Sequence, residues 1–171
     1  MNPYFIILTV VPFVLMAIIC AGMPIYRQKL IKSAGEKLIP LTKKNPWLSY
    51  VCSGIAFLLT VLSVMIDFGR LNFVIPACAV LGMFLSTRES TFLPVNGVYE
   101  NLLIVGSEIL FYKDIQSLPQ AEYSSEETLR EPDSVLVVIT KKYGKKRLMF
   151  NNSNEVQETL KVLKQKCRLE E

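Results

Sequence analysis

Histidine is missing from this chain of 171 residues. Its absence removes the commonest general base and the commonest metal ligand in proteins. Without histidine, a nucleophilic side chain would need a lysine or a carboxylate as its base. The sequence also has no Gly-x-Ser-x-Gly motif, no phosphate-binding glycine loop and no paired-carboxylate motif. We therefore predict no catalytic residues, no metal site and no cofactor, and we expect a protein that is not an enzyme.

Cysteine is scarce, and its placement excludes a disulfide framework. Cys20, Cys52 and Cys78 lie in apolar runs, and Cys167 lies near the end of an expected helix. In an apolar helix, cysteine packs as a small hydrophobic side chain. Packing is therefore the expected role. The alternative is acylation, for which Cys20 is the candidate because it is nearest the expected cytoplasmic face.

Charged side chains are absent from residues 4–26 and again from residues 47–66. Each run is long enough to cross about 30 Å of hydrocarbon as a helix. A third apolar run, residues 71–87, is near the short limit for a span. We predict a transmembrane region over residues 1–87 with three transmembrane helices, at about 4–26, 47–66 and 71–87. The uncharged start favours a retained first helix over a signal peptide.

The segment between the first two runs, residues 27–46, carries most of the charge in the first half. Its basic residues are Arg27, Lys29, Lys32, Lys37, Lys43 and Lys44, against one acid, Glu36. Short basic loops between spans stay in the cytoplasm. We therefore predict a multi-pass protein of the inner membrane, with its N-terminus outside and its C-terminal domain cytoplasmic. The loop is either extended and solvated, or a surface helix whose lysines contact lipid phosphates.

Small residues recur at intervals of four in the third run, at Cys78, Gly82 and Ser86. Such faces let transmembrane helices approach closely. The pattern predicts a tightly packed antiparallel pair of the second and third helices. A seam between two copies of the chain is the alternative. The spans contain no ionisable residue, which disfavours a transporter or a channel.

After a linker at residues 88–93, the pattern of residues 94–171 changes to that of strands. Two hairpins are predicted, one turning at Gly106-Ser107 and one at Tyr143-Gly144. The acidic stretch 122–133 between them is predicted to be a loop. A C-terminal helix over residues 153–167 follows, with an apolar stripe at Val156, Leu160, Leu163 and Cys167 and with Asn152 and Glu155 as a capping box. This predicts an α+β domain, an antiparallel strand bundle closed by the helix.

Certain residues of this domain resemble a known family. They are Gly97-Val98-Tyr99-Glu100-Asn101, then Phe111-Tyr112 followed by Asp114-Ile115, then two strand-like runs and a capped helix. Together they resemble the PH-like domain of small bacterial multi-pass membrane proteins of uncharacterised function. The resemblance covers roughly residues 94–168, and Tyr112-Lys113 replaces the family's aromatic pair with Trp. It implies a PH-like fold with a binding or scaffolding role.

The distribution of charge along the chain limits the classes of partner that can be expected. The chain to residue 87 has a net charge of +5, and the remainder has a net charge of −1. Nucleic-acid-binding domains carry a basic face on the folded part, so no nucleic acid is expected. The cluster Lys141, Lys142, Lys145, Lys146 and Arg147 is a candidate site for anionic membrane lipids. Its alternative is a solvated turn that prevents edge-to-edge pairing.

We therefore predict a membrane-anchored binding module at the cytoplasmic face, which meets lipid or a protein partner that the sequence does not identify. The alternative is an accessory subunit that assembles with a larger membrane complex through its transmembrane helices.

Overall fold

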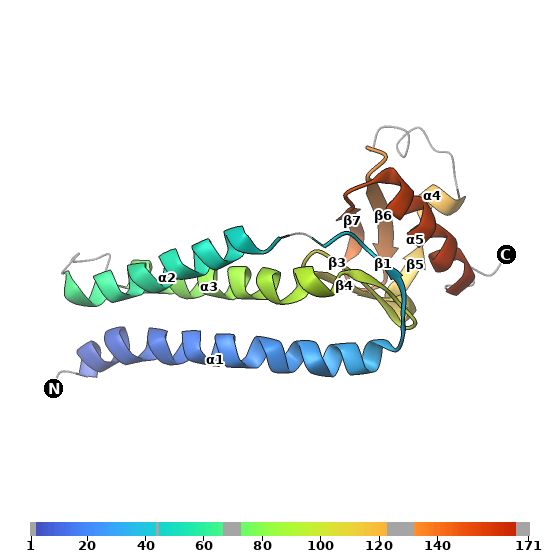
Figure 1. The fold of residues 1–171 in the computed structure, drawn as a ribbon. Coiled ribbons are helices and arrows are strands. Elements are labelled where there is room, and N and C mark those ends of the chain that lie inside the picture. The colour runs from blue at the N-terminus through green and yellow to red at the C-terminus, as the bar shows by residue number, and fades with distance from the viewer. Residues whose placement is uncertain (1–2, 44, 67–72, 123–131, 167–171) are drawn as a thin grey trace. The chain divides into compact units, whose positions relative to one another are not determined.

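The computed structural model describes residues 3–43, 45–66, 73–122 and 132–166. The chain forms two compact units (Figure 1). The helical unit comprises Met1–Ile31 and Lys44–Pro94, and the strand-rich unit comprises Lys32–Lys43 and Val95–Glu171. Each unit therefore contains two separate pieces of the sequence.

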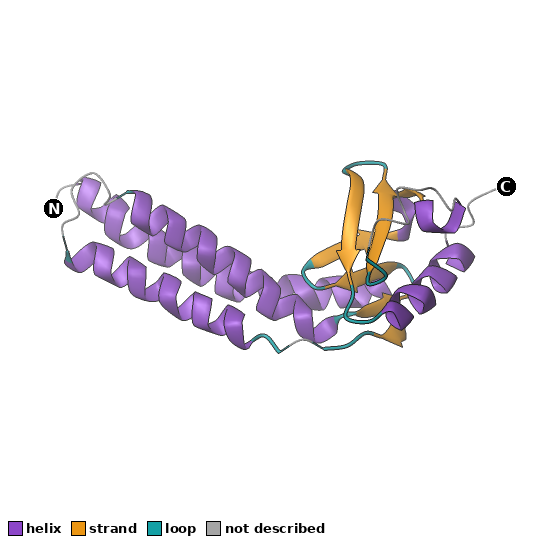
Figure 2. Cartoon of the chain, turned by 90° about the horizontal axis from the view of Figure 1, so that it is seen from above, coloured by secondary structure: helices purple, strands orange, loops and turns teal. Residues whose placement is uncertain are grey.

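In its described residues, the helical unit contains three long helices and a short 3₁₀ turn at its end. The helices are α1 (Pro3–Ala34, whose last residues belong to the strand-rich unit), α2 (Trp47–Met65) and α3 (Val74–Phe92), and the turn is η2 (Leu93–Val95). Helices α2 and α3 run side by side in both views (Figures 1 and 2). Pro12 and Pro24 lie inside α1.

Two helices in the described part of the chain, α1 from Val10 onward and α2, are long and apolar enough to cross a membrane. Only 11% and 17% of their most apolar windows are buried, so most of the apolar surface of both helices is left uncovered within the structure. Helix α3 does not meet the same criterion. Its last third carries Arg88 and Glu89 among hydroxyl side chains, which shortens its apolar part.

The strand-rich unit contains two antiparallel sheets. One has the order β1-β2-β3-β4, and the other has the order β5-β6-β7. The strands of the first sheet are β1 (Lys37–Pro40), β2 (Gly97–Tyr99), β3 (Leu102–Val105) and β4 (Glu108–Phe111). Those of the second are β5 (Ile115–Ser117), β6 (Val135–Thr140) and β7 (Gly144–Met149). Three helical segments complete the unit: η3 (Tyr112–Asp114), α4 (Pro119–Glu122) and α5 (Ser153–Lys166).

Both predicted hairpins are confirmed. Strand β3 pairs with β4 across Gly106-Ser107, and β6 pairs with β7, with Thr140 opposite Gly144. Gly106 and Gly144 have positive φ values, as the turns require. The part of the first hairpin before Gly106 is not one strand but two, β2 and β3, because the chain reverses at Glu100-Asn101 and Val98 pairs with Leu103.

The core of this unit lies between the strands and α5. Val98, Leu103, Leu136 and Leu148 are among its strand residues, and α5 contributes Val156 and the fully buried Leu163. Leu160 packs against the same core but is only partly buried. Three of the residues of the predicted stripe, Val156, Leu160 and Leu163, therefore close the core, as expected for an amphipathic helix on a sheet. The fourth, Cys167, lies outside the described residues.

The segment expected to be one basic loop, residues 27–46, has a different structure. Helix α1 continues eight residues beyond Tyr26 to Ala34, and residues 37–40 form β1, which pairs with β2. The expected linker, residues 88–93, is helical, since it lies in α3 and at the start of η2. Residues 67–70, which lie between the predicted second and third spans, and most of the acidic stretch 122–133 lie outside the described residues.

Candidate functional site

The point where α1 ends and β1 begins is a joint held to the β2–β3 turn by hydrogen bonds. The N–H of Glu36 donates to Glu100 Oε2 (3.1 Å), and the N–H of Glu100 donates to the carbonyl of Glu36 (3.1 Å). The N–H of Asn101 donates to the carbonyl of Ala34 (3.1 Å), and its side-chain amide donates to the carbonyl of Ser33 (3.2 Å). The β2–β3 turn thus satisfies carbonyls that the end of a helix leaves unpaired.

Gly35 makes this joint geometrically feasible. Its φ is +80°, a left-handed conformation that a side chain disfavours. A β-carbon there would lie 2.3 Å from Glu100 Oε2. The joint therefore requires glycine for two independent reasons.

A pocket of about 570 Å³ opens beside this joint. We call it the joint pocket. Its walls come from the end of α1, the β2–β3 turn, the end of β4, η3 and the end of α5. They are formed by Ser33, Glu100, Asn101, Phe111, Tyr112, Lys113 and Lys166. The volume is within the range of small-molecule sites.

Several polar groups of the joint pocket are already engaged. The Tyr112 hydroxyl lies 2.5 Å from the carbonyl of Tyr99 and 3.1 Å from that of Leu102. The Glu100 carboxylate and the Asn101 amide hold the joint. Lys113 lies over the Phe111 ring, with its Nζ 5.6 Å from the ring centroid. In the described part of the chain, neither Lys113 nor Lys166 forms an ion pair.

The side chain of Lys37 secures β1 against β2. Its ammonium donates to the carbonyl of Asn96 (2.5 Å) and lies 5.6 Å from the centroid of the Tyr99 ring. A β-carbon on Gly97 would lie 2.1 Å from Lys37 Cε and 3.0 Å from the backbone carbonyl oxygen of Ile39, so a side chain there would displace Lys37 and crowd β1. Burial lowers the pKa of Lys37 below its usual value, and Lys43 lowers it further.

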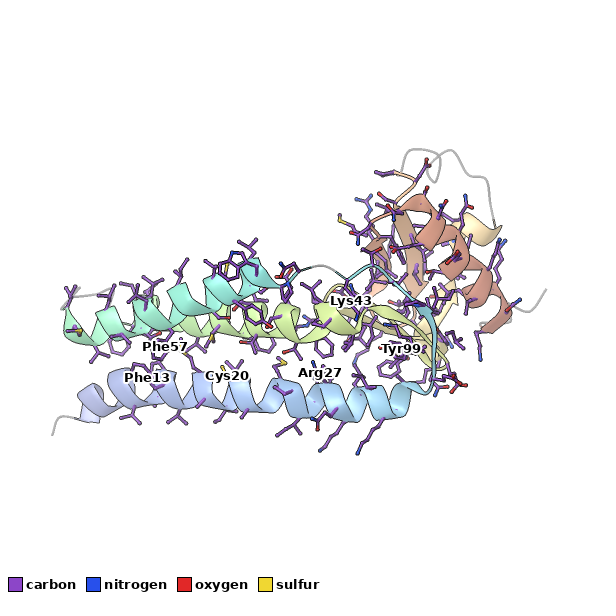
Figure 3. The ribbon with its side chains drawn as sticks, viewed as in Figure 1. Phe13, Cys20, Arg27, Lys43, Phe57 and Tyr99 are labelled. Atoms are coloured by element: carbon purple, nitrogen blue, oxygen red, sulfur yellow. The ribbon has the colours of Figure 1, made fainter. Side chains whose placement is uncertain are left out.

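Tyr99 is buried in the same region (Figure 3). Its hydroxyl donates to the carbonyl of Val95 (2.7 Å). Burial raises the pKa of the Tyr99 phenol, because the charged phenolate is the form that desolvation disfavours.

Thr42, which lies between β1 and α2, is hydrogen-bonded to Glu155 of α5. Glu155 Oε1 accepts hydrogen bonds from the N–H of Thr42 (2.8 Å) and from the Thr42 hydroxyl, and Oε2 accepts from the N–H of Asn151 (3.4 Å). The capping box predicted for Asn152 and Glu155 is therefore replaced by contacts to Asn151 and to a residue 113 positions away.

The five basic residues of the β6–β7 hairpin differ in their surroundings. Lys146 pairs with Glu108 of β4, with 2.8 Å between Nζ and Oε2. Lys145 and Arg147 alternate with Lys146 along β7 and are exposed, as are Lys141 and Lys142 in the turn. Tyr143 is 65% exposed, and Lys142 and Lys146 lie over its ring at 5.3 and 5.0 Å. The tip is thus an exposed aromatic ring among lysines.

The residues of the basic segment are spread over several elements. Arg27, Lys29 and Lys32 lie on α1, Lys37 lies on β1, and Lys43 is exposed after the strand (Figure 3). Lys44 lies outside the described residues.

In the helical unit, α2 and α3 meet through small side chains. Ala56 and Ala79 are buried together with Met16, and the Ser53 and Ser86 hydroxyls are 2.8 Å apart. Cys78 is exposed, so Ala79 rather than Cys78 continues the predicted stripe with Gly82 and Ser86. A β-carbon on Gly82 would meet that of Ala56 at 4.0 Å, an ordinary contact. Phe13 and Phe57 pack edge to face (Figure 3).

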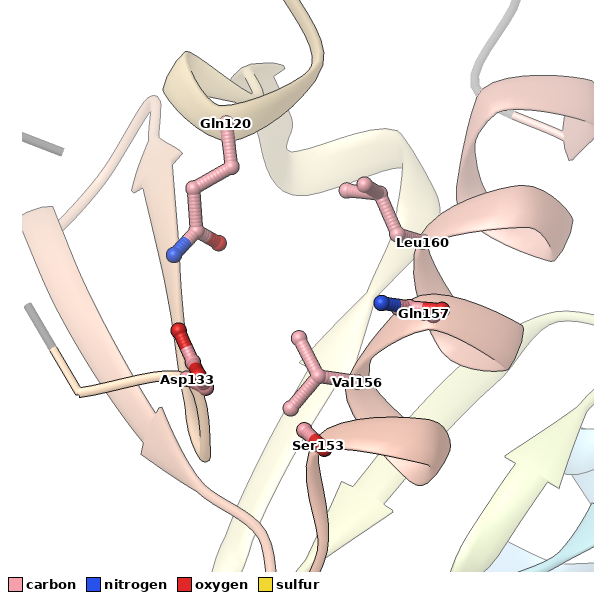
Figure 4. Close-up of a pocket in the computed structure, with 6 residues that line it drawn as sticks. All are labelled: Gln120, Asp133, Ser153, Val156, Gln157 and Leu160. Atoms are coloured by element: carbon pink, nitrogen blue, oxygen red, sulfur yellow. The ribbon is translucent and has the colours of Figure 1, made fainter. Parts of the chain in front are cut away.

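A second pocket, of about 330 Å³, lies between α4 and the first half of α5 (Figure 4). Val156 and Leu160 form its α5 wall, opposite Gln120 and Asp133. Gln120 bridges the backbone of β6, since its amide donates to the carbonyl of Val135 (2.8 Å) and accepts from the N–H of Val137 (3.2 Å). This side chain thereby satisfies strand groups that β5, only three residues long, does not reach.

The described residues contain no group of three or more acidic or cysteine side chains placed to hold a metal ion. No protein-family model, curated protein or solved structure matches the chain.

Proposed function

We propose that the chain is a membrane-anchored binding or scaffolding module, with a PH-like strand-rich unit on the cytoplasmic side of the membrane. The observation that carries the proposal is the pairing of β1 with β2. Strand β1 precedes α2 in the sequence, whereas β2 follows α3. Two paired strands lie on the same side of a membrane, so the chain between them crosses it an even number of times.

Helix α2 is apolar enough to cross once, so the proposal requires α3 to return. The apolar part of α3, residues 74–85, is about 18 Å long at 1.5 Å per residue, shorter than a typical 30 Å core. Local thinning and close packing on α2 would accommodate it. The Ser86 hydroxyl is satisfied by Ser53 and by the carbonyl of Gly82 (2.8 Å), which lowers the cost of placing it in lipid.

The charge of residues 27–46 supports the cytoplasmic side for β1. The rest of the strand-rich unit must then be cytoplasmic too, since β1 belongs to its sheet. The N-terminus lies outside in this arrangement. Two antiparallel sheets of four and three strands with a C-terminal helix support the PH-like interpretation, and the chain's lack of histidine favours binding over catalysis.

Labelling of single cysteines in intact cells tests this topology. In a background without the native cysteines, Ser33→Cys and Ser117→Cys should resist a membrane-impermeant maleimide until the cells are opened, and Gly69→Cys should react at once. Reaction of Ser117→Cys in intact cells would refute the proposal. The full chain is needed, because a fragment starting at residue 94 lacks β1.

The hairpin tip is the part of this module that we propose meets anionic lipid. Exposed lysines near a surface each contribute about 1 kcal/mol, and a tyrosine ring suits the interface. A polarity-sensitive dye on Tyr143→Cys in nanodiscs should shift to the blue when phosphatidylglycerol replaces phosphatidylcholine. High salt should remove the shift. So should replacement by Gln of Lys141, Lys142, Lys145 and Arg147. Replacement of Lys161 and Lys164 by Gln, the control, should not. Equal spectra in both lipids would leave the tip a solvated turn.

A second candidate function, an accessory subunit of a larger membrane complex, is favoured by an apolar cleft of about 430 Å³ in the helical unit. Val11, Pro12 and Leu15 of α1 face Pro76 and Val80 of α3 across it. A photoreactive amino acid at Leu15 should then give one discrete protein adduct in native membranes. Adducts with lipid alone would exclude a partner helix at this cleft.

A further inference from the structure

We propose that the joint pocket binds a phosphate group, from a lipid headgroup or a soluble phosphate ester, with Lys113 and Lys166 holding its charge. The two lysines come from different elements, η3 and the end of α5, and both line the pocket. Neither forms an ion pair in the described part of the chain. Two basic residues in the wall of one pocket can supply the counter-charge for a phosphate.

The other walls of the joint pocket suit the organic part of a phosphate ester. The Phe111 ring supplies an apolar face on which Lys113 already lies. Asn101 and Tyr112 are held in place by backbone hydrogen bonds, so the wall they form is rigid before a ligand arrives. A preformed wall reduces the conformational entropy lost on binding.

Among the described residues that line the pocket, Glu100 is the one with an acidic side chain. Its Oε2 is directed to the N–H of Glu36 and lies against Gly35, so the carboxylate is used by the joint. Its charge still opposes an anion in the pocket. Removing that charge while keeping the oxygen acceptor should therefore strengthen phosphate binding, a gain that a purely structural role of Glu100 does not predict.

The position of Ser33 favours a lipid source. Ser33 follows Tyr26, the end of the uncharged run, by seven residues of continuous helix, which is about 10 Å at 1.5 Å per residue. The headgroup region extends about 5–8 Å beyond the hydrocarbon on each side, so lipid phosphates would lie next to Ser33. The lipid source rests on the proposed membrane anchoring, but the phosphate chemistry of the pocket does not.

Calorimetric titration of the full chain in neutral detergent tests the proposal. The probes are dihexanoyl phosphatidylglycerol and, as the soluble arm, glycerol 3-phosphate. Lys113→Gln with Lys166→Gln should weaken binding at least about tenfold, the effect expected for losing charge-assisted hydrogen bonds. Lys161→Gln with Lys164→Gln, an equal charge change on the same helix outside the pocket, should alter it less than twofold. Glu100→Gln should tighten it severalfold.

If Lys113→Gln with Lys166→Gln weakens the binding of phosphatidylglycerol alone, the pocket binds lipid headgroups. If the same variant weakens the binding of both probes, the pocket binds phosphate esters in general. The proposal would be overturned if the wild-type chain bound neither probe, or if the two lysine double variants weakened binding equally. Retention of the chain in alkali-washed membranes reports on anchoring separately, so a failure of the anchoring proposal is distinguishable from a failure at the pocket.

Discussion

Gly35 and Glu100 approach so closely that a methyl group on the glycine would lie 2.3 Å from the glutamate's Oε2. Two chain segments more than sixty residues apart are fixed at this contact, because the same carboxylate accepts the N–H of Glu36. The joint therefore determines how the end of α1 enters the first sheet.

Gly35→Ala should lower the free energy of unfolding by about 2–4 kcal/mol, since it adds left-handed strain to a steric clash. Thermal unfolding in detergent measures the effect. Gly106→Ala is the matched control, because Gly106 has a φ of +63° but nothing within 4 Å of an added β-carbon. An equal loss in both variants would show that the contact with Glu100 has no cost of its own.

Truncation of the apolar face of α5 should affect stability in the order of burial. Leu163 is fully buried, so Leu163→Ala should cost about 2–5 kcal/mol, whereas the partly buried Leu160→Ala should cost less. Chemical denaturation followed by circular dichroism ranks the two variants. A larger loss at Leu160 would contradict the packing described for this helix.

Thr42 and Glu155 should show a coupling energy of about 1 kcal/mol in a double-mutant cycle, because the carboxylate accepts two hydrogen bonds from Thr42. The variants are Thr42→Val, Glu155→Ala and their combination. The same cycle between Thr42 and the exposed Glu158 provides the control. Additive losses at Thr42 and Glu155 would mean that α5 does not retain the segment leading into α2.

The α2–α3 contact should tolerate a small addition at Gly82 but not a large one. Gly82→Ala should be near neutral, since the nearest atom to its β-carbon, that of Ala56, is 4.0 Å away. Gly82→Leu should separate the helices and lower the unfolding temperature. Cys78→Leu, on an exposed position of the same helix, should have little effect. Equal stability of both leucine variants would place Gly82 outside the contact.

Alkaline pH should destabilise the strand-rich unit through Tyr99. Its pKa is raised in the folded chain, so above the ordinary tyrosine value of about 10 the unfolded chain loses its proton first, and stability falls as pH rises. Lys37 has the opposite effect on stability. Its pKa is lowered in the folded chain, so just below pH 10.5 the unfolded chain holds this proton more tightly and stability rises with pH. Tyr99→Phe should flatten the fall above pH 10, and Tyr143→Phe should not. Parallel profiles for wild type and Tyr99→Phe would contradict the assignment.

The sequence determined the elements whose signals are local. The uncharged run 47–66 predicted α2. The spacing of Val156, Leu160 and Leu163 predicted which face of α5 packs on the core. Gly106 and Gly144 predicted the positions of the two hairpin turns. Hydrophobic periodicity and glycine conformation depend on neighbours within a few residues, so they can be read along the chain.

The joint and its pocket depend on contacts between distant segments, which no local sequence pattern predicts. The tetrapeptide Lys37–Pro40 is a strand because β2, some sixty residues later, supplies its hydrogen-bond partners, and nothing in its own sequence distinguishes it from a basic loop. Glu155 looked like a local cap and instead binds Thr42 across 113 positions. Lys113 and Lys166 share a pocket because η3 and the end of α5 converge there. Contacts between distant segments depend on the whole fold, which no short stretch of sequence encodes.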